Sequence, residues 1–166
     1  IYIYENPKYS GISIPPGFAV RMKEQVPALQ GIKVAYGQGA LLEYVRLMPD
    51  VSVFTGNADL SGLVPFGGAG MINPPTSFAP EICVDLFKKL DSQDYAGAVA
   101  AQQKVDTAAR IVAARLRKWG RVPLQEVYRM RGFAVKRFPK WETEQMPKDE
   151  IAKLERELRD AGILGQ

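Results

Sequence analysis

Short apolar segments alternate with helical patterns over the first ninety residues, and this alternation restricts the fold more than any other feature. We expect strands at residues 1–4, 31–35, 51–54 and 70–72. Helical patterns lie between and after them, at residues 18–26, 41–48, 60–66 and 79–90. Strands that are separated by helices pair in parallel, so the pattern predicts successive βαβ units and one parallel sheet.

The chain from residue 94 onward is expected to be helical. Apolar residues recur there at spacings of three and four, at Val105, Ala108, Val112 and Leu116. This spacing forms one apolar stripe along a helix. Pro123 and Pro147 then begin two further helices, because proline fits the first turn. The expected class is therefore α/β with a helical C-terminal region.

The composition excludes several kinds of catalytic chemistry. The chain has 166 residues and no histidine. Histidine is the commonest metal ligand and the usual base near neutral pH. Ser-His-Asp, Cys-His and His-zinc sites are thus excluded from this chain alone, and we expect neither a metal nor a cofactor. Any catalysis should use Lys, Tyr, Asp, Glu or backbone groups.

The single cysteine and the length of the apolar runs indicate the cellular compartment of the protein. Cys83 cannot form a disulfide within the chain and is expected to be a small buried residue. Charges, Pro or Gly interrupt every apolar run before it reaches membrane-spanning length, and we identify no signal peptide. We therefore expect a cytoplasmic protein with no membrane partner.

A basic segment with interleaved aromatic residues runs from Arg115 to Lys140. Such a mixture can bind nucleic acid, but it also fits short helices that pack by their aromatic rings and expose their charges. Because we identify no nucleic-acid motif in it, a nucleic-acid module ranks third among the functions considered, and no nucleic-acid partner is expected.

Lys33 stands in the expected strand at residues 31–35, on the opposite face from Ile32 and Val34. If the sheet curls with Tyr4 inward, Lys33 would lie inward on the neighbouring strand. Burial removes the hydration that favours an ammonium, and a neutral amine is a nucleophile for a ketone or aldehyde carbonyl. Tyrosine beside it could relay protons. The alternatives are a solvated edge lysine and a tyrosine that only packs.

Several stretches resemble the dihydrodipicolinate synthase/N-acetylneuraminate lyase family. Tyr4-Glu5-Asn6-Pro7-Lys8-Tyr9-Ser10-Gly11 resembles its loop Tyr-Asn-x-Pro-x-x-Thr/Ser-Gly, and Gly31-Ile32-Lys33 resembles its Schiff-base strand. Thr55-Gly56-Asn57-Ala58-Asp59 is similar to its Ser-Gly-Asp-Asp loop. Gly68-Ala69-Gly70-Met71-Ile72-Asn73, with Phe78-Ala79-Pro80, is similar to its Gly-x-x-Gly-x-Ile-Ser…Ala-Pro segment, and residues 122–164 resemble its C-terminal helices.

The resemblance implies the C-terminal half of a (β/α)₈ barrel, strands five to eight, followed by a helical extension. Residues 1–92 would form the half-barrel, and residues 93–166 the final barrel helix and the C-terminal region. Lys33 would form an imine with pyruvate or a related 2-keto acid, and Tyr4 would relay protons. The implied substrate-binding residues are Ser10, Tyr9, Gly56, Ile72 and Asn73. Asp59 is expected to be a loop or helix-cap residue.

Three residues differ from the family pattern and narrow the predicted activity. Tyr9 stands where dihydrodipicolinate synthases carry an arginine, and Glu5 and Asn6 replace the usual pair, so a strict dihydrodipicolinate synthase is not expected. The acceptor aldehyde should be less acidic. The family's first four strands have no counterpart and the chain opens on Ile1, so we expect an N-terminal half-barrel segment, in cis or as a separate chain.

The function expected from the resemblance is a class I lyase or aldolase that acts on a 2-keto acid and an aldehyde. The alternatives are a hydratase-aldolase or dehydratase that uses the same lysine, and a non-catalytic half-barrel subunit. The family also implies a homo-oligomer, either a tetramer or a dimer.

Overall fold

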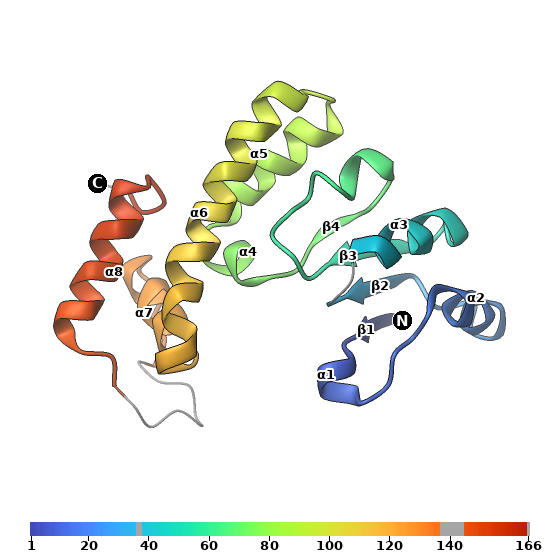
Figure 1. Cartoon of the computed structure of the whole chain (residues 1–166), viewed down its shortest axis with the longest axis horizontal. Coiled ribbons are helices and arrows are strands. Elements are labelled where there is room, and N and C mark those ends of the chain that lie inside the picture. The colour runs from blue at the N-terminus through green and yellow to red at the C-terminus, as the bar shows by residue number, and fades with distance from the viewer. Residues whose placement is uncertain (36–37, 137–144, 166) are drawn as a thin grey trace. The chain divides into compact units, whose positions relative to one another are not determined.

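A parallel sheet of four strands lies in the N-terminal part of the chain. The structure, a computed structural model, describes residues 1–35, 38–136 and 145–165. The strands lie in the order β1-β2-β3-β4, with all neighbours parallel (Figure 1). They are β1 (Tyr2–Glu5), β2 (Gly31–Val34), β3 (Ser52–Thr55) and β4 (Gly70–Met71). The α/β class and the positions of the strands are as the alternating pattern predicts.

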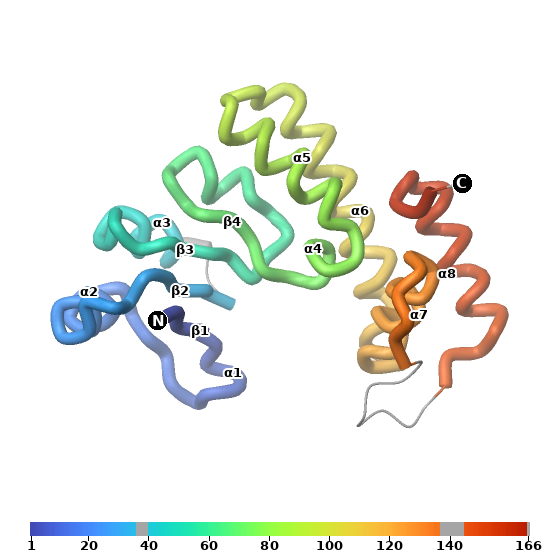
Figure 2. The backbone as a smooth tube through the Cα atoms, turned by 180° about the vertical axis from the view of Figure 1, so that it is seen from behind, coloured from blue at the N-terminus to red at the C-terminus, as the bar shows by residue number. Residues whose placement is uncertain are grey.

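Helices follow the strands along the chain, and they predominate in the described residues after β4 (Figure 2). The first group comprises α1 (Pro7–Ser10), α2 (Pro16–Gln25), α3 (Gln38–Leu47) and the 3₁₀ turn η1 (Val64–Phe66). The later group comprises α4 (Pro74–Phe78), α5 (Pro80–Asp91), α6 (Tyr95–Trp119), α7 (Val122–Met130) and α8 (Lys148–Asp160). Among the described residues, none of these helices combines the length and the apolar character needed to cross a bilayer.

The chain divides into two compact units. One contains residues 1–73 and 85–102, and the other contains residues 74–84 and 103–166. The predicted division into residues 1–92 and 93–166 refers to positions in a barrel and not to compactness, and it stays a prediction.

The core of the first unit lies between one face of the sheet and helices α2 and α3. Ile32, Val34 and Val53 supply the strand side of this core. Ala19 of α2, with Leu41, Tyr44 and Met48 of α3, supplies the helix side. Alternate strand residues point to opposite faces, so Lys33 projects away from this apolar layer.

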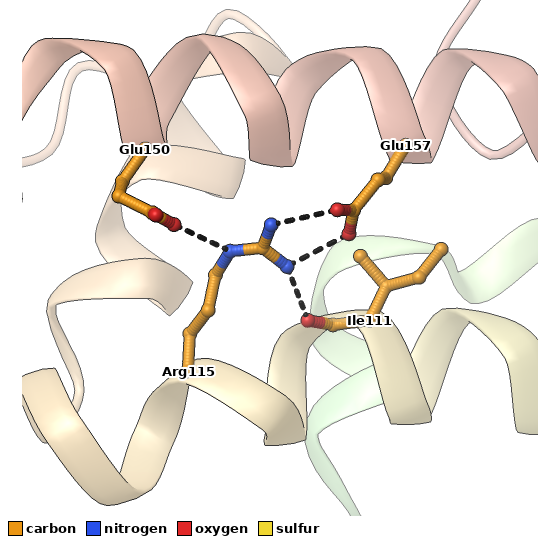
Figure 3. A network of polar contacts seen from close by, with 4 residues as sticks. All are labelled: Ile111, Arg115, Glu150 and Glu157. Carbon is orange, nitrogen blue, oxygen red and sulfur yellow. Dashed lines mark hydrogen bonds and ion pairs between the residues drawn. The ribbon is translucent and has the colours of Figure 1, made fainter.

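The second unit is built from helices. Val105, Ala108 and Val112 of α6 are fully buried, or nearly so, as their spacing predicts. Leu154 and Leu158 of α8 are also fully buried. Arg115 of α6 joins the two helices through hydrogen bonds to Glu157 of α8 (Figure 3).

Two short helices, α1 and α4, follow the first and the last strand of the sheet. Helix α1 begins with Pro7 and ends at Gly11, whose φ of 70° lets its N–H close the turn onto the Pro7 carbonyl. Helix α4 begins with Pro74 and Pro75. In both helices proline in the first turn favours a helical start.

Candidate active site

The pairing of β1 with β2 places Tyr4 directly beside Lys33. The side-chain nitrogen Nζ of Lys33 lies 4.1 Å from the centre of the Tyr4 ring. At this distance the ring face attracts a cation. Both residues lie on the sheet face opposite the helix-covered core, as the sequence predicts for a lysine that alternates with Ile32 and Val34.

An aromatic surface surrounds this pair. A Cβ at Gly31 would lie 2.2 Å from the Tyr2 ring, so the ring fills the space that only glycine leaves free. Tyr2 also approaches Phe54 of β3, with ring centres 6.2 Å apart. Tyr2 is 63% exposed and Tyr4 is 51% exposed, whereas Lys33 is only partly exposed. In this chain the lysine therefore stands on an open aromatic sheet face.

The Tyr4 hydroxyl has a partner of its own. The side-chain nitrogen Nδ2 of Asn6 donates a hydrogen bond to the Tyr4 oxygen at 2.7 Å. Asn6 is only 4% exposed, and its backbone carbonyl accepts hydrogen bonds from the N–H groups of Tyr9 and Ser10, both at 3.0 Å. The sequence singled out Asn6 only as a departure from a family pattern. Its place directly before Pro7 at the end of a strand was the available signal.

The helix-facing side of β1 carries a buried carboxylate. Glu5 is 4% exposed and accepts a hydrogen bond from the Ser13 hydroxyl at 3.2 Å. Burial, reinforced by the negative charge of Glu5, raises the pKa of Tyr44 to about 12. The Tyr44 hydroxyl donates to the Ile14 carbonyl. This side of the strand thus holds a protonated phenol within the core.

Two of the expected substrate-binding residues lie in α1, immediately after β1. The Ser10 hydroxyl lies 3.1 Å from the Asn6 carbonyl and 2.8 Å from the Ile12 carbonyl, and it accepts the Ile12 N–H at 3.2 Å. Its hydrogen bonds therefore serve the local turn. Tyr9 is 74% exposed. Both residues follow the carboxyl end of the strand that carries Tyr4.

The other three lie at or just beyond the carboxyl ends of β3 and β4. Gly56 donates its N–H to the Val34 carbonyl at 2.8 Å, and a Cβ there would lie 3.1 Å from Cα of Ala35. The Ile72 N–H donates to the Thr55 carbonyl at 2.9 Å. Nδ2 of Asn73 donates to the Asn57 carbonyl at 2.6 Å. The structure thus brings Tyr4 and Lys33 into contact and gives these three residues backbone partners at the same edge of the sheet.

Asp59, which the sequence predicts to be a loop or helix-cap residue, has a structural role in its loop. Asp59 is a loop residue whose Oδ1 accepts the Ser61 N–H at 2.9 Å, as expected for a capping residue. Within residues 1–35, 38–136 and 145–165, no three His, Cys, Asp or Glu side chains gather where they could hold a metal ion.

Acidic partners offset part of the basic segment. Arg115 pairs with Glu157, Arg131 pairs with Glu81, and Arg129 lies 3.9 Å from Glu126. Residues 137–140 of the segment lie outside the described residues. These pairings favour the interpretation of packed helices over a nucleic-acid surface.

Comparison with known proteins gives a consistent family match. The model of the dihydrodipicolinate synthetase family matches residues 1–160. A 4-hydroxy-tetrahydrodipicolinate synthase of Rhizobium meliloti is 29% identical over 136 residues, which cover 80% of this chain and 47% of that protein. The chain spans about half the length of the curated relatives that it matches.

Solved structures show the same fold at low sequence identity. A prophage protein of the dihydrodipicolinic acid synthase family from E. coli K12, solved with pyruvate, has a TM-score of 0.82 at 19% identity, with 98% of this chain and 56% of that chain covered. A 2-keto-3-deoxygluconate aldolase from Sulfolobus has a TM-score of 0.79 at 19% identity, with 99% and 57% covered.

Proposed function

Because the chain belongs to the dihydrodipicolinate synthetase family, we propose that it supplies the Schiff-base lysine, Lys33, of a class I lyase or aldolase. The substrate is pyruvate or a related 2-keto acid, and the second reactant is an aldehyde. The observation that carries the proposal is the contact between Lys33 and Tyr4, with Nζ 4.1 Å from the ring centre. A primary amine next to the ring of a tyrosine supports the proposal, because a phenol can move protons.

The reaction begins with covalent bond formation at Lys33. The neutral amine attacks the C2 carbonyl carbon of the keto acid, and Tyr4 carries a proton to the former carbonyl oxygen. That oxygen then leaves as water, and a C=N bond remains between C2 and Nζ. Loss of a proton from C3 gives an enamine, which attacks the carbonyl carbon of the aldehyde. Water finally hydrolyses the imine and releases Lys33. Cleavage follows the same steps in reverse.

We assign substrate contacts to the residues beyond the carboxyl ends of the strands. The Ile72 N–H is already bonded to Thr55, so its carbonyl is the group that Ile72 can offer to a substrate. Gly56 and Asn73 lie at the same edge, and Ser10 and Tyr9 lie in α1. In parallel α/β sheets this edge is where ligands bind.

We further propose that an N-terminal half-barrel segment, in cis or as a separate chain, completes the site. The sheet ends at β1 and β4, which leaves two edges unpaired among the described residues. Its aromatic face carries Tyr2 and Tyr4, both more than half exposed. Closing a barrel pairs both edges and covers that face. The complete enzyme would be a homo-oligomer, a tetramer or a dimer.

Borohydride reduction in the presence of pyruvate tests the proposal. The expected product is a stable adduct on Lys33, with a mass increase equal to pyruvic acid plus the two hydrogens of the reduction minus one water molecule. Lys33→Ala should abolish it. Lys8→Ala, which removes an exposed lysine from the neighbouring α1, should leave it unchanged.

A second assay needs no aldehyde. Pyruvate methyl hydrogens should exchange with solvent deuterium through the enamine, and proton NMR in D₂O follows that exchange. A folded protein that forms no adduct and shows no exchange would be the non-catalytic subunit. An active protein whose product retains its carbon skeleton but loses water would be the dehydratase of the same family.

A further inference from the structure

A buried amide is bonded to the phenol of the proposed proton relay. We propose that Asn6 is a positioning residue, which orients the Tyr4 hydroxyl and assists it whenever Tyr4 gives up its proton. This inference rests on the proposed function of Tyr4 and Lys33. Its evidence is the hydrogen bond of 2.7 Å from Nδ2 of Asn6 to the Tyr4 oxygen.

Two backbone hydrogen bonds and the following proline hold the main chain of Asn6 in place. Its backbone carbonyl accepts N–H groups from both Tyr9 and Ser10 at 3.0 Å, and Pro7 follows it at the start of α1. The residue is 4% exposed, so water does not compete for its side chain. The amide is therefore a fixed donor next to a side chain that is itself half exposed.

The polarity of the bond sets the direction in which Tyr4 can send its proton. A phenol oxygen has one O–H and two lone pairs, and Asn6 occupies one of the lone pairs. An amide NH₂ accepts no proton, so the Tyr4 O–H points away from Asn6. When Tyr4 passes its proton to the oxygen that leaves C2, the resulting phenolate keeps the Asn6 bond. A hydrogen bond to an anion is about twice as strong as one between neutral groups.

Stability alone does not explain an asparagine here. Its Oδ1 is buried and, within the described part of the chain, has no hydrogen-bond partner. An unsatisfied buried acceptor destabilises the fold, whereas an apolar side chain of similar size would not. The Asn6 side chain forms its hydrogen bond through the donor Nδ2, and the acceptor of that bond is the Tyr4 oxygen.

A double-mutant cycle tests the inference, with pyruvate methyl exchange in D₂O measured on the intact protein. Asn6→Leu should lower the turnover number for exchange about tenfold, the effect of one charge-assisted hydrogen bond, and leave KM for pyruvate unchanged. In the Tyr4→Phe background, Asn6→Leu should have less than about a twofold effect, because the bond is already absent. Equal losses in both backgrounds would overturn the inference.

Two further variants separate positioning from folding. Asn6→Asp keeps the size and polarity but replaces the donor with a carboxylate, which accepts the Tyr4 O–H and should also lower exchange. Ser13→Ala removes a neighbouring hydrogen bond to Glu5 and should leave exchange unchanged. Wild-type rates in folded Asn6→Asp protein would contradict the inference even if Asn6→Leu does not fold.

The outcomes also distinguish this inference from the proposed function. If the wild-type protein, completed by its N-terminal half-barrel segment, forms no borohydride adduct and shows no exchange, both are wrong. If it forms the adduct and exchanges, but the effects of Asn6 and Tyr4 are additive, only the role of Asn6 is wrong.

Discussion

Replacing Glu157 with Gln should loosen helix α8 far more than the same change at Glu155, two residues away. The guanidinium of Arg115 donates to both Glu157 carboxylate oxygens, from Nη1 at 2.9 Å and from Nη2 at 3.0 Å (Figure 3). The Arg115 side chain is only 7% exposed. The pair of Arg159 with Glu155 is just as short, at 2.8 Å, but its side chains are 43% and 40% exposed.

The burial of Arg115 determines how much stability the Glu157→Gln substitution should remove. Removing one partner of a buried, hydrogen-bonded ion pair costs about 3–5 kcal/mol. Glu157 is itself 36% exposed, and Arg115 keeps the Ile111 carbonyl at 2.9 Å and Glu150 at 3.9 Å. These factors reduce the expected loss to about 2 kcal/mol. Glu155→Gln breaks an exposed pair between residues four apart and should cost about 0.4 kcal/mol.

Native-state hydrogen exchange on the backbone amides of Leu154 and Leu158 measures the difference. A loss of 2 kcal/mol corresponds to exchange about 30-fold faster, and a loss of 0.4 kcal/mol to exchange about twofold faster. Equal acceleration in the two variants would refute the reasoning, because burial of the arginine would then not determine the strength of the pair.

Two other measurements follow from the ionisable groups. The hydrogen bond from Arg115 lowers the pKa of Glu157, so the stability gained from the pair is complete above the unfolded value of about 4.3 and is lost as pH falls through the lower folded value. Urea unfolding should therefore show wild type losing more stability than Glu157→Gln between about pH 6 and about pH 3, and parallel curves would count against this. Burial, with a smaller contribution from the charge of Glu81, raises the pKa of Cys83 to about 11. At pH 8 about one thiol in 1,000 is then ionised, and iodoacetamide should label Cys83 only after unfolding; rapid labelling of native protein would show an accessible thiolate.

The positions of the strands and of the long helices could be predicted from the sequence, because their signals are local. The expected strand at residues 31–35 and the observed β2 (Gly31–Val34) differ by one residue. The apolar stripe at Val105, Ala108 and Val112 is buried as its spacing requires. Side-chain alternation also separates Lys33 from the core face, because it depends only on the strand period of two.

The sequence also marked Tyr4 and Lys33 as chemical candidates, through a family pattern and not through contacts. The partners of these residues could not be read in the same way. The sequence around Gly31 does not indicate that the Tyr2 ring occupies the space that a side chain at position 31 would need. The sequence predicts Ser10 as a substrate ligand by its residue type, and only the structure shows that its hydroxyl also bonds the local turn at Ile12.

Amphipathic patterns and turn residues therefore determined which segments become strands and helices and which face of each is buried. Tertiary structure alone decided that Tyr4 pairs with Lys33, that Asn6 donates to the Tyr4 hydroxyl and that Arg115 reaches Glu157. The physical reason is that periodicity gives the direction of a side chain relative to its own backbone. A contact depends in addition on strand register and on how closely two segments approach, and packing of the whole chain sets both.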